Sequence, residues 1–276
     1  MSATTTTPGP ATTASEVRPR AVYSRVAGFG LLLLAAAPLL MLIVGVVSGM
    51  SLADDGPFLA VVAVVSLLAS ALAWRYESWS KIVAIVVALL AAAAIFWMAF
   101  GLAFPASFGD FVPGVAFVLG FFLTLGGAIG AIVQGRRGNA AASATTGERR
   151  IIVGATAVLV VAMVASGALT LLTGNAAADA SGQTATMADF AFAEGTYTVA
   201  ADETATLVVH NSDGFVHDIA VPELGIDPVT VLPGSDAVVE LPETPSGTYT
   251  IYCTLHSDTS TKDPQAAGMA ATLVAQ

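Results

Sequence analysis

The sequence predicts a helical membrane bundle followed by an all-β sandwich domain. The first observation is composition: of 276 residues, 55% are hydrophobic and only 11% are charged, whereas a soluble domain carries about a quarter charged residues. The second is a series of long apolar runs in the first two thirds of the chain, each suited to a membrane-spanning helix. The third is a change near residue 183 to short alternating segments separated by turn residues, which is typical of a β-sandwich.

The N-terminal segment, residues 1–25, is rich in Thr, Ala and Pro and is predicted to be a disordered cytoplasmic tail. The transmembrane region follows over residues 26–172. Its five predicted spans are residues 26–50, 58–74, 82–104, 112–133 and 151–172. The second is the shortest. The first is much longer than the apolar core of a signal peptide, so we expect an uncleaved helix.

The basic residues outside the C-terminal domain all fall on one side of this five-helix arrangement. They are Arg18, Arg20, Arg25, Arg75, Lys81, Arg136, Arg137, Arg149 and Arg150. The positive-inside rule places that side in the cytoplasm, and an odd number of spans then places the C-terminal domain outside. We therefore expect an integral plasma-membrane protein in contact with lipid, with a cytoplasmic N-terminus and an extracytoplasmic C-terminal domain.

The predicted spans contain no Asp, Glu, Lys, Arg or His. Pumps, transporters and proton relays place ionisable residues inside the bilayer, so the bundle is interpreted as an anchor and scaffold. A small-molecule or quinone pocket between the helices remains an open alternative.

Residues 173–182 are rich in Ala, Gly, Ser and Asn and are predicted to be a linker. The C-terminal domain, residues 183–276, should contain strands near 204–209, 237–241, 248–253 and 270–274. From residue 174 onward the chain has fourteen Asp and Glu but a single Lys, which argues against binding nucleic acid. The single cysteine of the chain excludes an intrachain disulfide.

Four side chains of this domain form a candidate metal site. His217 opens an apolar segment, Cys253 and His256 form a Cys-x-x-His motif, and Met269 precedes the last strand. Two imidazoles, a thiolate and a thioether are the ligands of a mononuclear blue-copper centre. Zinc is less well suited, because a structural zinc site uses four strong tetrahedral ligands.

The segments 208–221, 247–256 and 268–269 together resemble the cupredoxin family, in particular plastocyanin and halocyanin. The resemblance covers about a third of the chain and implies a Greek-key β-sandwich with one copper ion near one end. It also implies that His217, Cys253 and His256 are ligands and that Met269 is the axial ligand. The familiar loops of the family place the axial Met only a few residues after the second His, whereas twelve residues intervene here. Gln265, or no axial protein ligand, therefore remains an alternative.

Other residues near these segments have plainer interpretations. Met187 is expected in the core, and His210 should point to solvent because it alternates with apolar neighbours. Asn211 either braces the loop that carries His217 or forms an ordinary Asx-turn. Asp218 either tunes the site or is a surface charge.

The sequence favours single-electron transfer by a copper protein that is not an enzyme. Copper oxidases and nitrite reductases need ligands for further copper ions, and this chain has three His and one Cys. Two alternatives remain: copper binding for delivery, buffering or sensing, and a non-metal interaction module on a membrane scaffold. The acidic domain would suit an unidentified redox protein with a basic docking face.

Overall fold

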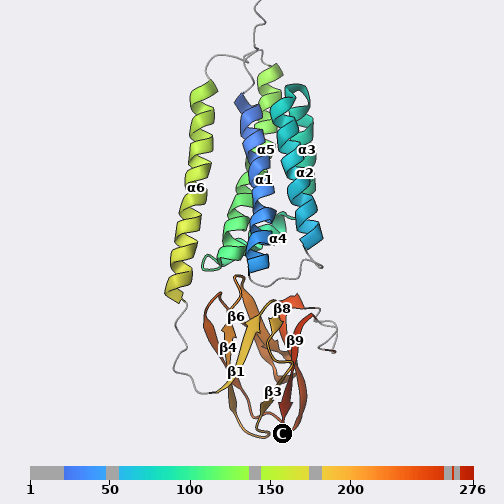
Figure 1. Ribbon diagram of the computed structural model, residues 1–276, viewed down its shortest axis with the longest axis vertical. Helices are drawn as coiled ribbons and strands as arrows, with labels where there is room; N and C mark the ends of the chain where they lie inside the picture. The colour runs from blue at the N-terminus through green and yellow to red at the C-terminus, as the bar shows by residue number, and fades with distance from the viewer. Residues whose placement is uncertain (1–21, 48–55, 137–143, 174–181, 258–262, 264–267) are drawn as a thin grey trace, which may run out of the picture.

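The computed structural model describes residues 22–47, 56–136, 144–173, 182–257, 263 and 268–276. Figure 1 shows a bundle of long helices joined end to end to a β-sandwich, with the C-terminus at the far end of the sandwich.

The helical part contains four continuous helices long and apolar enough to cross a membrane. They are α1 (Val22–Val47), α2 (Gly56–Arg75), α5 (Phe108–Arg136) and α6 (Ala144–Thr173). The apolar helices indicate an integral membrane protein, as the composition predicts. α1 begins before the predicted start of the first span at residue 26.

The third predicted span, residues 82–104, is not one helix. It is divided into α3 (Glu77–Ala92), α4 (Ile95–Phe100) and the 3₁₀ turn η1 (Gly101–Ala103), with a bend of 67°. Counting the bent pair as one span gives up to five spans. No Pro or Gly lies at the break itself.

Two glycines allow the bent segment to pack on α5. A Cβ at Gly114 would lie 2.6 Å from the Met98 carbonyl oxygen, and one at Gly101 would lie 2.4 Å from the Asp110 carbonyl oxygen. Both approaches are closer than any side chain permits. The segment after the break thus packs on α5 through backbone contacts that only glycine allows, although residues 91–94, all alanine, would favour a straight helix.

α5 is the central helix of the bundle and packs closely on α1. A Cβ at Gly127 would lie 2.5 Å from the Ala27 nitrogen, and one at Gly120 would lie 2.8 Å from the Leu34 nitrogen. Small residues at such a crossing let the two backbones approach and gain van der Waals contact inside a bilayer. α6 lies at the side of the bundle (Figure 1) and is mostly exposed along its apolar length.

The C-terminal domain is a sandwich of two sheets. Its strands are β1 (Gln183–Ala188), β2 (Ala191–Phe192), β3 (Thr196–Val199), β4 (Ala205–Asn211), β5 (His217–Val221), β6 (Ile226–Val231), β7 (Asp236–Leu241), β8 (Gly247–Ser257) and β9 (Gly268–Ala275). One sheet has the order β2-β1-β4-β7, and the other has the order β3-β9-β8-β5-β6. The four predicted strands correspond to β4, β7, β8 and β9, with β8 extending further than expected.

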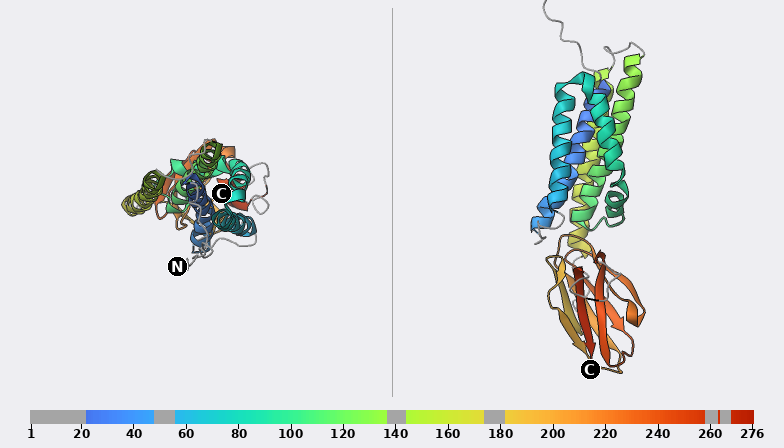
Figure 2. Two further views of the ribbon diagram at one scale, coloured as in Figure 1. Left: turned by 90° about the horizontal axis from the view of Figure 1, so that it is seen from above. Right: turned by 90° about the vertical axis from the view of Figure 1, so that its right-hand side faces the viewer.

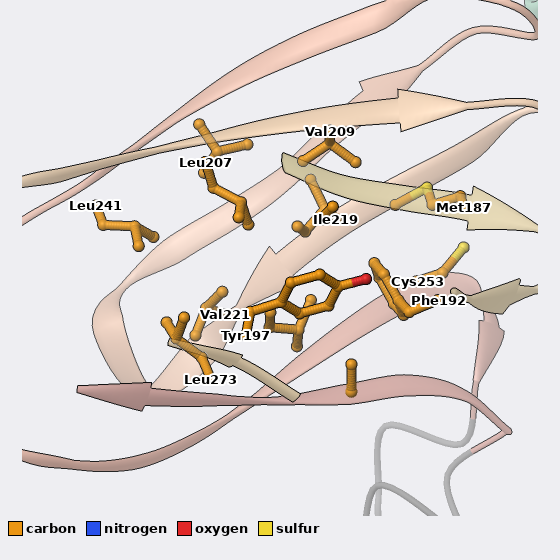
Figure 3. Close-up of a cluster of buried hydrophobic side chains, with 14 of the residues drawn as sticks. Met187, Phe192, Tyr197, Leu207, Val209, Ile219, Val221, Leu241, Cys253 and Leu273 are labelled. Atoms are coloured by element: carbon orange, nitrogen blue, oxygen red, sulfur yellow. The ribbon is translucent and has the colours of Figure 1, made fainter. Parts of the chain in front are cut away.

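The two sheets enclose the core, and burial alternates along β3 and β9 as the period-2 pattern predicts, whereas β5 is buried at every position. Figure 3 shows part of this core, with Leu207 and Val209 from one sheet facing Ile219 and Leu273 from the other. Met187 is fully buried there, as expected. Cys253 belongs to the same cluster, so the thiol is held among apolar side chains.

Candidate metal centre

Three of the predicted ligands converge at one end of the sandwich. The Cys253 Sγ atom lies 3.6 Å from His217 Nδ1 and 3.4 Å from His256 Nδ1, and the two Nδ1 atoms are 3.1 Å apart. A point equidistant from these three atoms lies about 2 Å from each, close to the distances of about 2.0–2.3 Å that imidazole and thiolate ligands make to a metal. The three side chains are thus positioned as a candidate copper site.

An irregularity in β8 lets Cys253 and His256 face the same point. Residues three apart on a regular strand point to opposite faces of the sheet. The pairing of β8 with β9 shifts register between Tyr252 and Ser257, so the strand is bulged where both donors lie. Both donors therefore lie within the end of β8 itself.

Asp213 fixes the orientation of His217. The Oδ2 atom of Asp213 lies 2.8 Å from His217 Nε2, and both side chains are buried. Because a carboxylate can only accept here, the proton of the neutral ring lies on Nε2 and leaves Nδ1 free to bind a metal. Asp213 also accepts the backbone N–H groups of Asp189 and Phe190.

The loop before His217 is braced by Asn211, which is fully buried. Its Nδ2 donates to the carbonyl oxygens of Phe215 and Val231, each at 2.9 Å, and its Oδ1 accepts the Asp213 N–H at 2.9 Å. The two predicted roles, a brace and an Asx-turn, are therefore both present.

Asp218 is not a surface charge. It is 5% exposed, and its carboxylate accepts the Thr254 N–H and hydroxyl, each at 2.5 Å. It joins the residue after His217 to the residue after Cys253. The alternation pattern did not indicate this burial.

Met269 lies close to the three donors in spite of the long insertion. It is 1% exposed and belongs to the core cluster that contains Cys253. Ser257 and Gly268 pair directly across β8 and β9, and Ser257 Oγ donates to the Met269 carbonyl at 2.5 Å. The ends of the intervening loop are thus held together. Gln265, the alternative axial residue, lies outside the described part of the chain.

Burial sets the protonation of two donors in the metal-free protein. Desolvation raises the pKa of the Cys253 thiol to about 12, and the neighbouring Asp218 charge acts in the same direction. Desolvation of the His256 ring, with repulsion from His217, lowers the pKa of His256 to about 4, although the residue as a whole is exposed. For Asp213, burial raises the pKa, but the hydrogen bonds from His217 and the backbone outweigh it and hold the pKa below its usual value.

Phe190 and Asp213 are the neighbours of the site that sequence reasoning missed. The Phe190 ring meets His217 and His256 edge-on, with centroids 5.4 and 5.2 Å apart. Nothing in the spacing of Phe190 indicates this contact. The remaining histidine, His210, is partly exposed and pairs with Asp236 at 2.6 Å, outside the group of three donors.

The comparisons with known proteins concern mainly the C-terminal part. The family described as the cupredoxin-like domain matches residues 156–262. The matched range begins inside α6 and ends before β9, so Met269 lies beyond it. None of the curated proteins compared with the chain matches it.

Three solved structures illustrate the likeness. Reduced auracyanin from Roseiflexus castenholzii is 16% identical, with 35% of this chain and 98% of that chain covered and a TM-score of 0.27. Amicyanin from Paracoccus versutus is 16% identical, with 37% and 89% covered and a TM-score of 0.28. A heme-copper terminal oxidase is 13% identical, with 34% and 60% covered and a TM-score of 0.26, so this chain spans less than two thirds of it.

Proposed function

We propose that this chain, whose C-terminal part is a cupredoxin-like domain, is a membrane-tethered blue-copper protein that carries single electrons. The observation that best supports this function is the convergence of His217, Cys253 and His256, whose ligand atoms all lie within 4.8 Å of one another. A copper ion held by one thiolate and two imidazoles supplies one-electron chemistry with little change of geometry. Met269 is the proposed axial ligand.

The protein around the donors is suited to that role because it holds them in fixed positions. Asn211 holds the loop before His217, and Asp213 holds the His217 ring. Asp218 connects β5 to β8 by accepting hydrogen bonds from Thr254, next to Cys253. Each of these polar side chains is buried. Donors held in this way move little when the charge of the site changes, which favours fast electron transfer.

We propose a carrier rather than an enzyme. The whole sequence has three His and one Cys, and His210 lies apart from the site. Within the residues that the structure describes, a single group of His, Cys, Asp and Glu side chains is arranged to hold a metal. These counts support one mononuclear centre and no second copper centre for catalysis.

The same proposal places the copper domain on the extracytoplasmic face. Its support is the positive-inside rule. The basic residues that the structure describes lie near the starts of α1, α3 and α6 and the ends of α2 and α5, at the bundle end remote from the sandwich. The acidic domain would suit a redox partner with a basic docking face, and the rate of such a reaction falls as ionic strength rises.

The test uses the purified full chain in detergent, loaded with cupric ion. We expect strong visible absorption from the copper–thiolate bond and reversible one-electron reduction, both lost in Cys253→Ser. The matched control is His210→Asn, which should leave both signals intact. Exchangeable copper without strong absorption would favour delivery, buffering or sensing, and no copper binding would favour a non-metal interaction module.

A further inference from the structure

We propose that Asp110, at the start of α5, is a positioning residue for His217 through a contact that docks the sandwich on the helical bundle. The link to copper rests on the function proposed above, whereas the docking contact does not. Figures 1 and 2 both show the sandwich below the end of the bundle where α6 ends. The contact joins the first turn of α5 to residues 214–216, the loop immediately before His217.

Two reciprocal hydrogen bonds form this contact. The Gly109 N–H donates to the Gly214 carbonyl at 3.2 Å, and the Val216 N–H donates to Asp110 Oδ2 at 2.8 Å. The first N–H groups of a helix have no partner within it. The sandwich loop therefore supplies an acceptor that α5 lacks, and α5 supplies an acceptor to Val216.

The contact is close and largely buried. Phe215 is 4% exposed and Val216 is 2% exposed. A Cβ at Gly109 would lie 2.5 Å from the Gly214 carbonyl oxygen and 3.0 Å from the Phe215 ring. Any side chain at position 109 must therefore displace the loop.

Two routes lead from this contact to the candidate ligands. Val216 directly precedes His217, so the Asp110 bond fixes the backbone from which that imidazole projects. In addition, the Phe215 and Phe190 rings lie 5.3 Å apart, and Phe190 meets both His217 and His256 edge-on. A shift of residues 214–216 would therefore move His217 through the backbone, and would move both His217 and His256 through the Phe215 and Phe190 rings.

Asp110 is itself held by the bundle. Ser107 Oγ donates to Asp110 Oδ2, and Thr170 of α6 donates to the Ala106 carbonyl at 2.5 Å. The segment that leads into α5 is thus tied to α6. Because Ser107 holds the Asp110 carboxylate in place, this carboxylate is able to hold the Val216 N–H of the sandwich loop.

The first experiment measures the docking bond in the metal-free full chain by amide hydrogen exchange at Val216. We expect Asp110→Ala to raise the exchange rate on the order of tenfold, because the amide loses its acceptor. Asp110→Asn retains a carbonyl acceptor and should give an intermediate rate. Ser107→Ala keeps the acceptor but frees its carboxylate on the helix side, so it should raise the rate less than Asp110→Ala does. An unchanged rate in Asp110→Ala overturns the contact.

The second experiment measures the effect on His217 with a matched pair of variants on α5. Gly109→Ala forces the loop to move, whereas a Cβ at Gly126 has no neighbour within 4 Å. We expect Gly109→Ala and Asp110→Ala to change the ¹⁵N shifts of the His217 ring in metal-free protein and the EPR spectrum of copper-loaded protein. Gly126→Ala should change neither.

The outcomes separate the docking contact from the copper function. Faster Val216 exchange with unchanged His217 shifts would mean a docking contact without a positioning role, which overturns the proposal. A wild-type chain that binds no copper would refute the proposed function, while the exchange and NMR measurements would still decide whether Asp110 positions His217.

Discussion

The Asp213 carboxylate lies 2.8 Å from the Nε2 atom of His217, on the side of the ring opposite the candidate copper site. Both residues are buried, and Asp213 is tied to two backbone N–H groups of the β1–β2 turn. A carboxylate in this position selects the tautomer of the ring and makes the other nitrogen a stronger donor. Asp213 therefore sets both the orientation of the His217 ring and the electron density that its Nδ1 atom can donate to a metal.

Replacing Asp213 with Asn should weaken copper binding about 10- to 100-fold, because outer partners of metal-bound histidines contribute by that amount. The reduction potential should rise, since a neutral acceptor donates less density to the ring and stabilises the cupric state less. Affinity by competition with a chelator and potential by voltammetry check both. The control is Asp236→Asn, which alters a similar Asp–His pair at His210 outside the site. Equal effects of the two variants would contradict the assignment.

Gly268 should be more sensitive to alanine than other glycines with positive φ. Its φ is +81°, and a Cβ there would lie 2.9 Å from the His256 carbonyl oxygen. Gly225 has a φ of +69° and open space around it. Gly225→Ala should cost about 1 kcal/mol of unfolding free energy from backbone strain alone, and Gly268→Ala about 1–3 kcal/mol, since the β8–β9 contact must also move. Chemical denaturation of the full chain measures both, and equal losses would show that the contact with His256 adds nothing.

Copper binding should release about one proton per ion at neutral pH. The pKa of the Cys253 thiol is raised to about 12, so the metal-free protein keeps that proton, whereas His256 with a pKa of about 4 is already neutral. Cys253 binds the metal as a thiolate and not as a thiol. The apparent copper affinity should therefore rise about tenfold per pH unit between neutral pH and the thiol pKa. Calorimetry in buffers of different ionisation enthalpy counts the protons. Cys253→Ser is the control and should release none, and an affinity independent of pH would refute this protonation state.

The three donors were readable from the sequence because their residue types are few and chemically distinctive. The chain has one Cys and three His, and His210, which was predicted to point to solvent, is partly exposed and lies outside the group of donors. Membrane spans were readable for a similar reason, since long apolar runs have few other interpretations. Met187, expected in the core, is fully buried.

The features that were not readable depend on contacts between distant segments. The bend after α3 lies in a run of alanines with no local signal, and the segment that follows it packs closely on α5 at Gly101 and Gly114. Asp218 carries a charge and would be expected at the surface, but it is buried and hydrogen-bonded to Thr254 of another strand. The bond between Asp110 and Val216 joins two parts of the chain that the sequence presents as separate domains.

The orientation of the chain can be decided by labelling single cysteines in a Cys253→Ser background. Glu240 is exposed on β7 of the sandwich, and Thr146 is exposed near the start of α6, at the opposite end of the molecule. Because basic residues lie at that end of the helices, the positive-inside rule predicts that this end faces the cytoplasm. A membrane-impermeant maleimide should therefore label Glu240→Cys in intact cells, and Thr146→Cys only after lysis. The reverse pattern would place the copper domain in the cytoplasm, which would rule out an extracytoplasmic electron carrier.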